Sequence, residues 1–428
     1  MSRRRVYVGF LTIFMLLSVL WGQNEAIYRK DEPDSLLKAI REMVEKENAK
    51  KDSMTESIQE RYRKKKEAEE KAEKELISSL AGVNKPAGPE AFSKVWHNSP
   101  VPQHYSGMCW CFCTTSFIES ELKRRHNIEI KLSELFTVYW EYVEKARRFI
   151  EMRGNSEFGQ GSEANAVFYR MESYGAVPKE VYKGLKKYDL HVHNQLFRDM
   201  NNYLQYCKEE NFWNEKVILS TIKAILNYYI GQPPEKFTYQ GKEYTPQSFY
   251  RDFMQIRMSD YAGFMSTKSA PFYEQAEFDV PDNWWHDSTY YNIPLDEWYT
   301  IIRKSIKNGY SVVIGGDVSE PGKIGEEDVA FIPDFDIDPE NIDQDAREFR
   351  IYNHTTTDDH GIHIVGHTTT RSGLNKKDWY LIKDSGRSSR AGDFHGYYMF
   401  REDFIRLKML TFMVHKDMAR EILKKFKK

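Results

Sequence analysis

The spacing of hydrophobic and polar positions changes twice along the chain. Between about residues 29 and 80, apolar residues recur every three or four positions among many Lys and Glu, which predicts charged, exposed helices. Helical spacing then marks 109–125, 133–152, most of 190–258, and 295–307. Strand-like runs follow at 311–315, 361–369, 379–384 and 396–400. Helices that precede strands in this way predict an α+β fold and not a series of alternating βαβ units.

Breaks in this pattern divide the chain into parts. Gly and Pro residues at 82–93 indicate a linker. We therefore predict a charged helical arm with its linker at 23–95 and one globular domain at 96–428. The arm is best explained as an exposed stalk, and a role in docking onto a partner or another protomer has no support in the sequence.

The first residues have the composition of an export signal. Arg3, Arg4 and Arg5 precede an apolar run from Val6 to Trp21, just short of the roughly 18 residues that a membrane-spanning helix needs. We predict a signal peptide at 1–22, cleaved near Gly22, and hence a secreted or periplasmic protein. An uncleaved membrane anchor is the alternative, and no other run in the sequence could cross a bilayer.

Charge and cysteine content narrow the classes of function. The 62 Lys and Arg nearly balance the 64 Asp and Glu, and this argues against a dedicated nucleic-acid binder. Three of the four cysteines, Cys109, Cys111 and Cys113, fall within five residues, and Cys207 stands apart. Alternate positions on a helix point to different sides, so a disulfide framework explains these three poorly. At least one thiol is expected to serve chemistry or to pack as a small buried side chain.

Cys109 stands where a thiol becomes a nucleophile. Ser106 and Gly107 favour a helix start, which places Cys109 in the first turn of a long helix. There the helix dipole and the free backbone N–H groups stabilise a thiolate. Gln103 precedes this turn, and its amide could join the Cys109 backbone N–H in a two-donor oxyanion hole.

A thiolate needs an imidazole beside it, and His360 is the best candidate. It precedes an apolar strand and so would lie at a strand end. The imidazole must itself be oriented by a third group. Asp384 follows the next predicted strand, and adjacent strands would bring it near His360. His363 and His367 resemble a metal-ligand cluster with His360 on paper, but strand alternation turns them both away from it, so we predict no metal site.

Several segments in the correct order resemble one family. Gln103 followed by Ser106-Gly107-Met108-Cys109-Trp110 resembles the active-site stretch of the papain superfamily, and the match is best to its bleomycin-hydrolase and aminopeptidase C branch. The supporting segments are 133–150 with Gly159-Gln160-Gly161 and Tyr174 to Pro178, Ile230 to Phe237 with Tyr244-Thr245-Pro246, and Asn353 to His360. The resemblance covers about Val101 to His415 and leaves the arm outside.

The resemblance implies a two-lobed fold with a helical half, a β-rich half and a cleft between them. It implies Cys109 as nucleophile, His360 as base and Gln103 as oxyanion donor, with a helical insertion at about 190–270. The third catalytic residue of the family is Asn before Ser-Trp-Gly; here Asp384 precedes Ser385-Gly386-Arg387. The missing Trp is expected to remove the cover over the hydrogen bond between the third residue and His360.

These features predict a cysteine peptidase that acts on peptides by acyl-enzyme chemistry, without a cofactor. Family members extend past the equivalent of His415 into a tail that confers aminopeptidase action, whereas this sequence ends at Lys428. Aminopeptidase and endopeptidase action therefore both stay open. The alternatives are an inactive peptide-binding protein on the same scaffold and an amidase or acyltransferase for non-peptide substrates. Assembly into a homo-oligomer, as in family members that form rings, stays open too.

Overall fold

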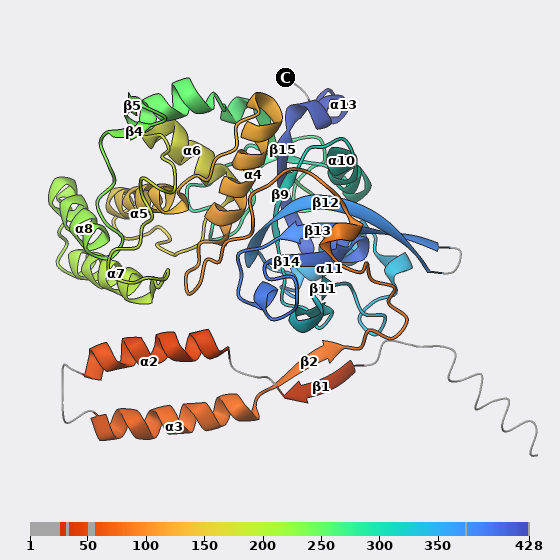
Figure 1. Cartoon of the computed structure of the whole chain (residues 1–428), viewed down its shortest axis with the longest axis horizontal. Coiled ribbons are helices and arrows are strands. Elements are labelled where there is room, and N and C mark those ends of the chain that lie inside the picture. The colour runs from red at the N-terminus through yellow and green to blue at the C-terminus, as the bar shows by residue number, and fades with distance from the viewer. Residues whose placement is uncertain (1–25, 31–33, 50–55, 373–374, 427–428) are drawn as a thin grey trace, which may run out of the picture.

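The computed structural model describes residues 26–30, 34–49, 56–372 and 375–426, and the predicted signal peptide at 1–22 lies outside them. Helices gather on one side of the body and a large sheet on the other, with helix α4 (Cys109–His126) between them (Figure 1). The expected α+β arrangement of a helical lobe and a sheet lobe is therefore present. Among the described residues, no helix is both long and apolar enough to cross a membrane.

The helical lobe follows the predicted periodicity closely. Its other helices are α5 (Glu134–Glu151), α6 (Ala164–Tyr174), α7 (Asn194–Glu209) and α8 (Glu215–Tyr229). Ser133 caps α5, since its side chain accepts a hydrogen bond from the Phe136 backbone N–H. The aromatic and aliphatic positions that repeat along α4 and α5, such as Phe117 and Tyr142, are buried in one common core.

The second half of the predicted helical insertion contains a hairpin. Strands β4 (Phe237–Tyr239) and β5 (Lys242–Tyr244) pair antiparallel, ahead of the short helix α9 (Pro246–Ser248) and a π-helical turn at Phe249–Met254. Gln240 and Gly241 both have positive φ, at 47° and 77°. Two consecutive residues with positive φ form the two-residue turn that joins tight hairpins. Helical spacing at 190–258 therefore predicted too much helix here.

The sheet lobe is one mixed sheet with the strand order β10-β11-β14-β13-β12-β9-β15-β6-β8-β7, to which β3 (Ser93–Lys94) adds beside β12. The strands are β6 (Tyr261–Met265), β7 (Gln275–Ala276), β8 (Tyr290–Asn292), β9 (Val312–Gly316), β10 (Lys323–Ile324), β11 (Val329–Ala330), β12 (His360–Ser372), β13 (Asn375–Lys383), β14 (Tyr397–Arg401) and β15 (Met409–His415). The accompanying helices are α10 (Leu295–Lys307), α11 (Gln344–Tyr352), α12 (Glu402–Lys408) and α13 (Arg420–Leu423). The predicted helix after Pro294 and the four predicted strands are confirmed.

One glycine lets the two lobes meet closely. Helix α4 packs along β12, and a Cβ atom on Gly361 would lie 2.9 Å from the Cys113 sulfur and 3.4 Å from the Trp110 Cα. A side chain at Gly361 would therefore push α4 away from the strand. Because His360 precedes Gly361 and Cys109 begins α4, this contact brings the two predicted catalytic residues together.

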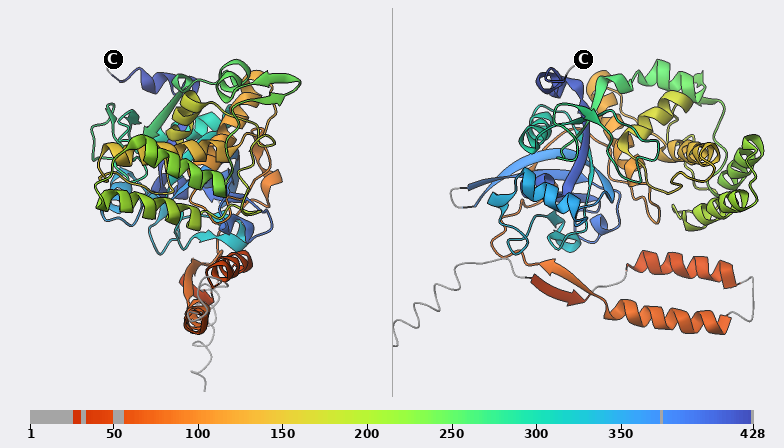
Figure 2. Two further views of the ribbon diagram at one scale, coloured as in Figure 1. Left: turned by 90° about the vertical axis from the view of Figure 1, so that its left-hand side faces the viewer. Right: turned by 180° about the vertical axis from the view of Figure 1, so that it is seen from behind.

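The amino-terminal arm is only partly the helical stalk that the sequence predicts. Helices α2 (Ser35–Ala49) and α3 (Glu56–Ala72) form its outer part, and strands β1 (Ala26–Lys30) and β2 (Lys74–Ser78) pair at its base. The arm lies below the body in two perpendicular views and in the view from behind (Figure 2). The prediction of helix up to residue 80 was wrong at 74–78, where the strand ladder with β1 satisfies the backbone instead.

Candidate active site

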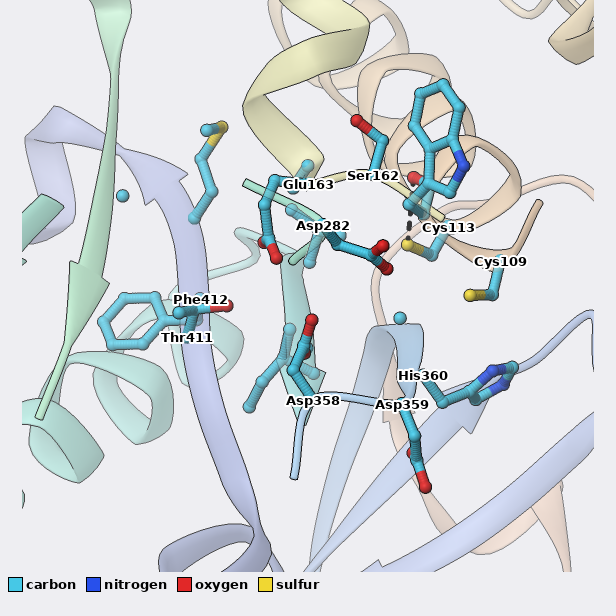
Figure 3. Close-up of a pocket in the computed structure, with 18 of the residues that line it drawn as sticks. Cys109, Cys113, Ser162, Glu163, Asp282, Asp358, Asp359, His360, Thr411 and Phe412 are labelled. Atoms are coloured by element: carbon cyan, nitrogen blue, oxygen red, sulfur yellow. Dashed lines mark hydrogen bonds between the residues drawn. The ribbon is translucent and has the colours of Figure 1, made fainter. Parts of the chain in front are cut away.

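Cys109 and His360 lie side by side where the two lobes meet (Figure 3). Cys109 is the first residue of α4, as predicted, so its thiol stands at the positive end of an 18-residue helix. His360 is the first residue of β12. The Nε2 atom of His360 is 2.7 Å from Oδ1 of Asp384, which directly follows β13. Since the Asp384 carboxylate can only accept a hydrogen bond, Nε2 of His360 carries a proton. The other ring nitrogen, Nδ1, is then available to the Cys109 thiol.

The charges of this group stabilise one another. Burial alone would lower the pKa of His360, but the negative charges of Asp384 and the Cys109 thiolate raise it well above 6.5. Burial would raise the pKa of Asp384, yet the charge and hydrogen bond of His360 lower it to about 2. The arrangement therefore favours a protonated His360 beside an ionised Asp384 at neutral pH.

The pair of Asp384 and His360 is buried although the family Trp is missing. The side chains are 2% and 12% exposed, respectively. Gly386 stands in place of the Trp, and its backbone N–H donates to Oδ1 of Asp384 at 2.8 Å. A Cβ atom at Gly386 would be 3.3 Å from Cε1 of His360, which shows how closely the backbone covers the ring. The expected loss of shielding was wrong, because the main chain itself provides the cover.

Gln103 lies buried on the loop that leads to α4. Its backbone N–H donates to the Ser385 carbonyl at 2.9 Å, and its Oε1 accepts from the Ser385 hydroxyl at 2.7 Å. Its Nε2 donates a hydrogen bond to the Ser106 carbonyl at 2.7 Å. An amide nitrogen carries two N–H groups, so one of them is still available to a substrate. The segment after Asp384 therefore holds Gln103 from both sides.

Cys109 differs from the other thiols in exposure. It is partly exposed, whereas Cys111, Cys113 and Cys207 are buried, and all four are free. Burial raises the pKa of each of the three buried thiols. The prediction that these residues pack and do not react is consistent with their places: Cys111 and Cys113 lie on α4, and Cys207 lies in the helical-lobe core.

The pocket beside Cys109 carries carboxylates that the sequence prediction missed. Its lining includes Glu163, Asp282 and Asp358, together with Cys109 and His360. Figure 3 shows the three carboxyl groups converging on one space. Two of them lie next to segments already singled out, since Glu163 follows the Gly159-Gln160-Gly161 turn and Asp358 precedes His360 by two positions. Their separation along the chain gave no sign that they would meet.

Comparison with known proteins now places the chain. A model described as the Peptidase C1-like family matches residues 44–156 and 159–428. The chain belongs to this family. The match begins within α2 of the arm, so the prediction that the arm lies outside the resemblance was wrong.

Relatives of this peptidase C1-like chain carry names of the predicted branch. Aminopeptidase C of Streptococcus thermophilus is 23% identical over 266 residues, which is 51% of this chain and 58% of that protein. Bleomycin hydrolase of Mus musculus is 23% identical over 281 residues, or 53% of this chain and 60% of that protein. The chain thus spans less than two thirds of the length of these relatives.

A solved structure shows the fold. The structure of PepW from Lactobacillus rhamnosis matches with a TM-score of 0.63 and 18% identity, over 79% of this chain and 85% of that one. Together with the two lobes described above, this likeness shows an α+β, papain-like fold, as predicted.

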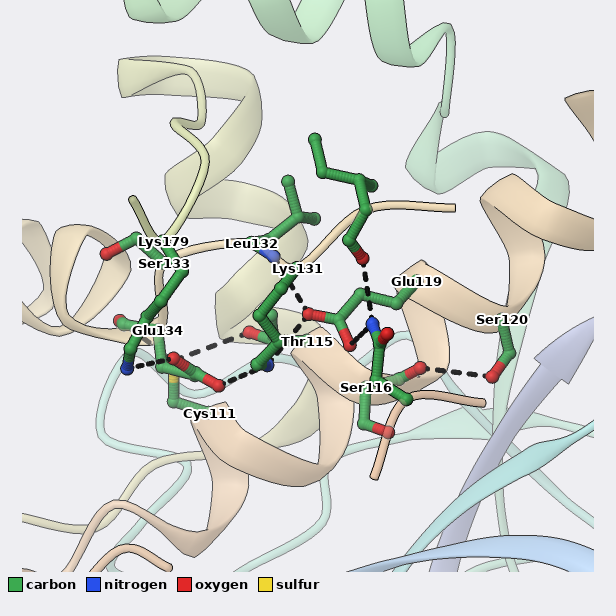
Figure 4. Close-up of polar contacts among 12 residues, drawn as sticks. Cys111, Thr115, Ser116, Glu119, Ser120, Lys131, Leu132, Ser133, Glu134 and Lys179 are labelled. Atoms are coloured by element: carbon green, nitrogen blue, oxygen red, sulfur yellow. Dashed lines mark hydrogen bonds and ion pairs between the residues drawn. The ribbon is translucent and has the colours of Figure 1, made fainter. Parts of the chain in front are cut away.

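A buried ionic network fixes α4 in this peptidase C1-like fold (Figure 4). Glu119 of α4 and Glu134 of α5 are both fully buried, and Lys131 bridges them at 2.8 and 2.5 Å. Lys179 adds a second contact to Glu134 at 2.8 Å. Burial would raise the pKa of Glu134, but these two lysines lower it far below 4.5. The network ties the helix that carries Cys109 to the rest of the helical lobe.

The other histidines of β12 have separate partners. Nδ1 of His363 is 2.9 Å from the Ser116 hydroxyl on α4, and Nε2 of His367 is 3.0 Å from Oδ1 of Asp378. Strict alternation would place His363 and His367 on the same face of the strand. A β-bulge between Ile364 and Gly366 breaks that alternation, so the two rings face different sides. Among the described residues, no cluster of His, Cys, Asp and Glu could hold a metal ion.

Proposed function

We propose that this chain is a cysteine peptidase that hydrolyses peptide bonds through a thioester at Cys109. The observation that carries the proposal is the line of Cys109, His360 and Asp384 at the meeting of the lobes, with the thiol at a helix start and the imidazole held by a buried carboxylate. The family and the names of the relatives support it.

The reaction follows from these positions. The Cys109 thiolate attacks the scissile carbonyl carbon, and the oxygen becomes an oxyanion near the Cys109 backbone N–H and the remaining N–H of Gln103. His360 gives its Nδ1 proton to the leaving amine as the C–N bond breaks. Water then attacks the thioester and passes a proton to His360, which restores the thiolate and releases the carboxylic acid. Asp384 keeps the imidazole oriented throughout.

The proposal includes peptide substrates and export, and it leaves the site of cleavage to experiment. The predicted signal at 1–22 supports a secreted or periplasmic enzyme. Comparing the amino terminus of the protein from an extracellular or periplasmic fraction with Gln23 would test export. Recovery of the protein only in the cytoplasm with residues 1–22 intact would contradict it.

The decisive test is hydrolysis of a mixed peptide library under reducing conditions by the wild type, Cys109→Ala and Cys207→Ala. We expect cleavage by the wild type and by Cys207→Ala, since Cys207 is a buried thiol remote from the pocket, and no cleavage by Cys109→Ala. Cuts at amino termini would identify an aminopeptidase, and internal cuts an endopeptidase. Peptide binding without cleavage by any variant would show an inactive peptide-binding protein instead.

A further inference from the structure

The pocket beside Cys109 is strongly acidic for a buried site. Four carboxylates line it, those of Glu163, Asp282, Asp358 and Asp359, and among the described lining residues His360 is the only basic one. Asp359 points away from the other three in Figure 3, and its Oδ1 accepts from the Val318 backbone N–H at 3.0 Å. Three carboxyl groups therefore face the space that a bound substrate would enter.

Glu163 has an unused acceptor aimed into this space. The residue is 5% exposed, and its Oε1 has no hydrogen-bond partner, while Oε2 accepts weakly from the Tyr290 hydroxyl at 3.4 Å. It stands at the N-cap of α6, yet its side chain does not cap the helix. A buried carboxylate oxygen without a partner is costly unless a ligand satisfies it.

Asp282 lies beside Glu163 in the pocket, against the glycine turn (Figure 3). A Cβ atom on Gly161 would lie 1.9 Å from Oδ2 of Asp282, so only glycine leaves room for this carboxylate. The nearest counter-charge, Lys145, already donates to the carbonyls of Gly159 and Gly161. The glycine turn thus leaves room for the Asp282 carboxylate beside the pocket, and the carbonyls of the turn accept hydrogen bonds from Lys145.

The carboxyl groups also perturb one another. Burial and the nearby Asp358 raise the pKa of Glu163 well above 4.5, and burial, with Asp282 and Asp359, raises the pKa of Asp358 to about 7, against the opposing effects of Glu163 and His360. Burial and the neighbouring negative charges therefore disfavour full ionisation of this cluster. A cation in the pocket would favour the ionised carboxylates and displace a proton from the cluster.

We propose that Glu163, Asp358 and Asp282 form a subsite for an ammonium group of the substrate. The pocket is narrow, so it suits a small cationic head better than a bulky side chain. The ammonium could be the free amino terminus of the peptide or the side chain of a lysine close to the scissile bond. This proposal depends on the proposed peptidase function in one respect, namely that the ligand is a peptide.

The test uses binding, so that it does not depend on turnover. Full-length Cys109→Ala is titrated with two sets of short peptides. In the first set the amino terminus is either free or acetylated. In the second set one of the first three residues is either lysine or its uncharged analogue norleucine. We expect the cationic peptide to bind about 10- to 100-fold more tightly than its neutral counterpart. Preference for a free terminus or for lysine identifies the source of the ammonium.

Glu163→Gln and Asp358→Asn, each added to Cys109→Ala, should abolish this preference, and Glu243→Gln on the exposed hairpin strand β5 is the matched control. Calorimetry in buffers of different ionisation enthalpy should also show proton release when the cationic peptide binds near pH 7. This second readout stands even if one of the variants fails to fold.

The outcomes separate the two proposals. Equal binding of cationic and neutral peptides, or a preference that survives both pocket substitutions, overturns the subsite. If the wild type still cleaves neutral peptides in that case, the peptidase function stands. If the preference is present and lost in the variants while the wild type cleaves nothing, the subsite stands and the peptidase function fails.

Discussion

At the scale of single residues, the replacement of the family Asn by Asp384 changes the charge of the site more than its shape. A neutral amide would orient His360 equally well, but the carboxylate adds a negative charge 2.7 Å from the ring. Position along the sequence was enough to predict that Asp384 meets His360, because adjacent strands align their ends. The shielding by the Gly386 backbone could not be predicted, since it depends on how a loop folds back.

Asp384→Asn should therefore move the pH dependence of the reaction. Without the carboxylate charge the pKa of His360 falls, so the imidazolium is lost at a lower pH. We expect the alkaline limb of kcat/KM to shift down by about 1–3 pH units while activity near pH 6 is largely kept. A pH series with one peptide substrate measures this, and an unchanged alkaline limb would rule out the charge effect.

Gln103 and Ser385 should act together on kcat. Gln103→Ala removes an oxyanion donor and is expected to lower kcat by about 10²- to 10³-fold. Ser385→Ala removes only the hydroxyl that holds Oε1 of Gln103, so its effect on kcat should be smaller, about 10-fold, with little change in KM. If Ser385→Ala still lowers kcat when Gln103 is already Ala, Ser385 does not act by positioning that amide.

At the scale of elements, α4 joins the chemistry to the scaffold. Its amphipathic spacing and start were predictable, because Ser106, Gly107 and the apolar repeat are local signals. Its ionic anchor was not, because Glu119, Lys131 and Glu134 are charged residues that sequence patterns assign to the surface. Only the packing of α4 against α5 shows that these charges are buried and paired.

Lys131→Met should destabilise the fold by about 3–5 kcal/mol, since it leaves two buried carboxylates without their shared partner. The lowered pKa of Glu134 means that its stabilising contribution is present above about pH 4.5 and disappears as the pH falls through the folded pKa. The difference in unfolding free energy between wild type and variant should therefore shrink on acidification. Urea unfolding at several pH values measures it, and Lys64→Met on exposed α3 should behave like the wild type.

At the scale of the whole molecule, the arm and the body are two differently built parts. Hydrophobic periodicity predicted the α+β body, but not the β1–β2 pair, whose strands have only five residues each and adjoin highly charged helical segments. The described links from the base of the arm to the body include the Ser78 N–H to the Pro321 carbonyl and an ion pair of Arg29 with Glu326. Ion pairs this exposed contribute little to stability.

Limited proteolysis should report this difference. Trypsin is expected to cut first in the arm, at the exposed basic residues Arg61 and 63–66 of α3, and to leave the body intact for much longer. Mass spectrometry of the early fragments identifies the cut. First cleavage between residues 101 and 415 would contradict this order, and peptide hydrolysis by the trimmed protein would show whether the body alone is active.

Four cysteines with only one partly exposed thiol have a practical consequence. In the native protein an alkylating dye should couple to a single atom, the sulfur of Cys109, and three further equivalents should react after unfolding in denaturant. The dye taken up per chain would then count the competent molecules in a preparation, before any substrate is known. The same selectivity would allow a reporter or a cross-linker to be placed at the reacting atom without engineering the sequence.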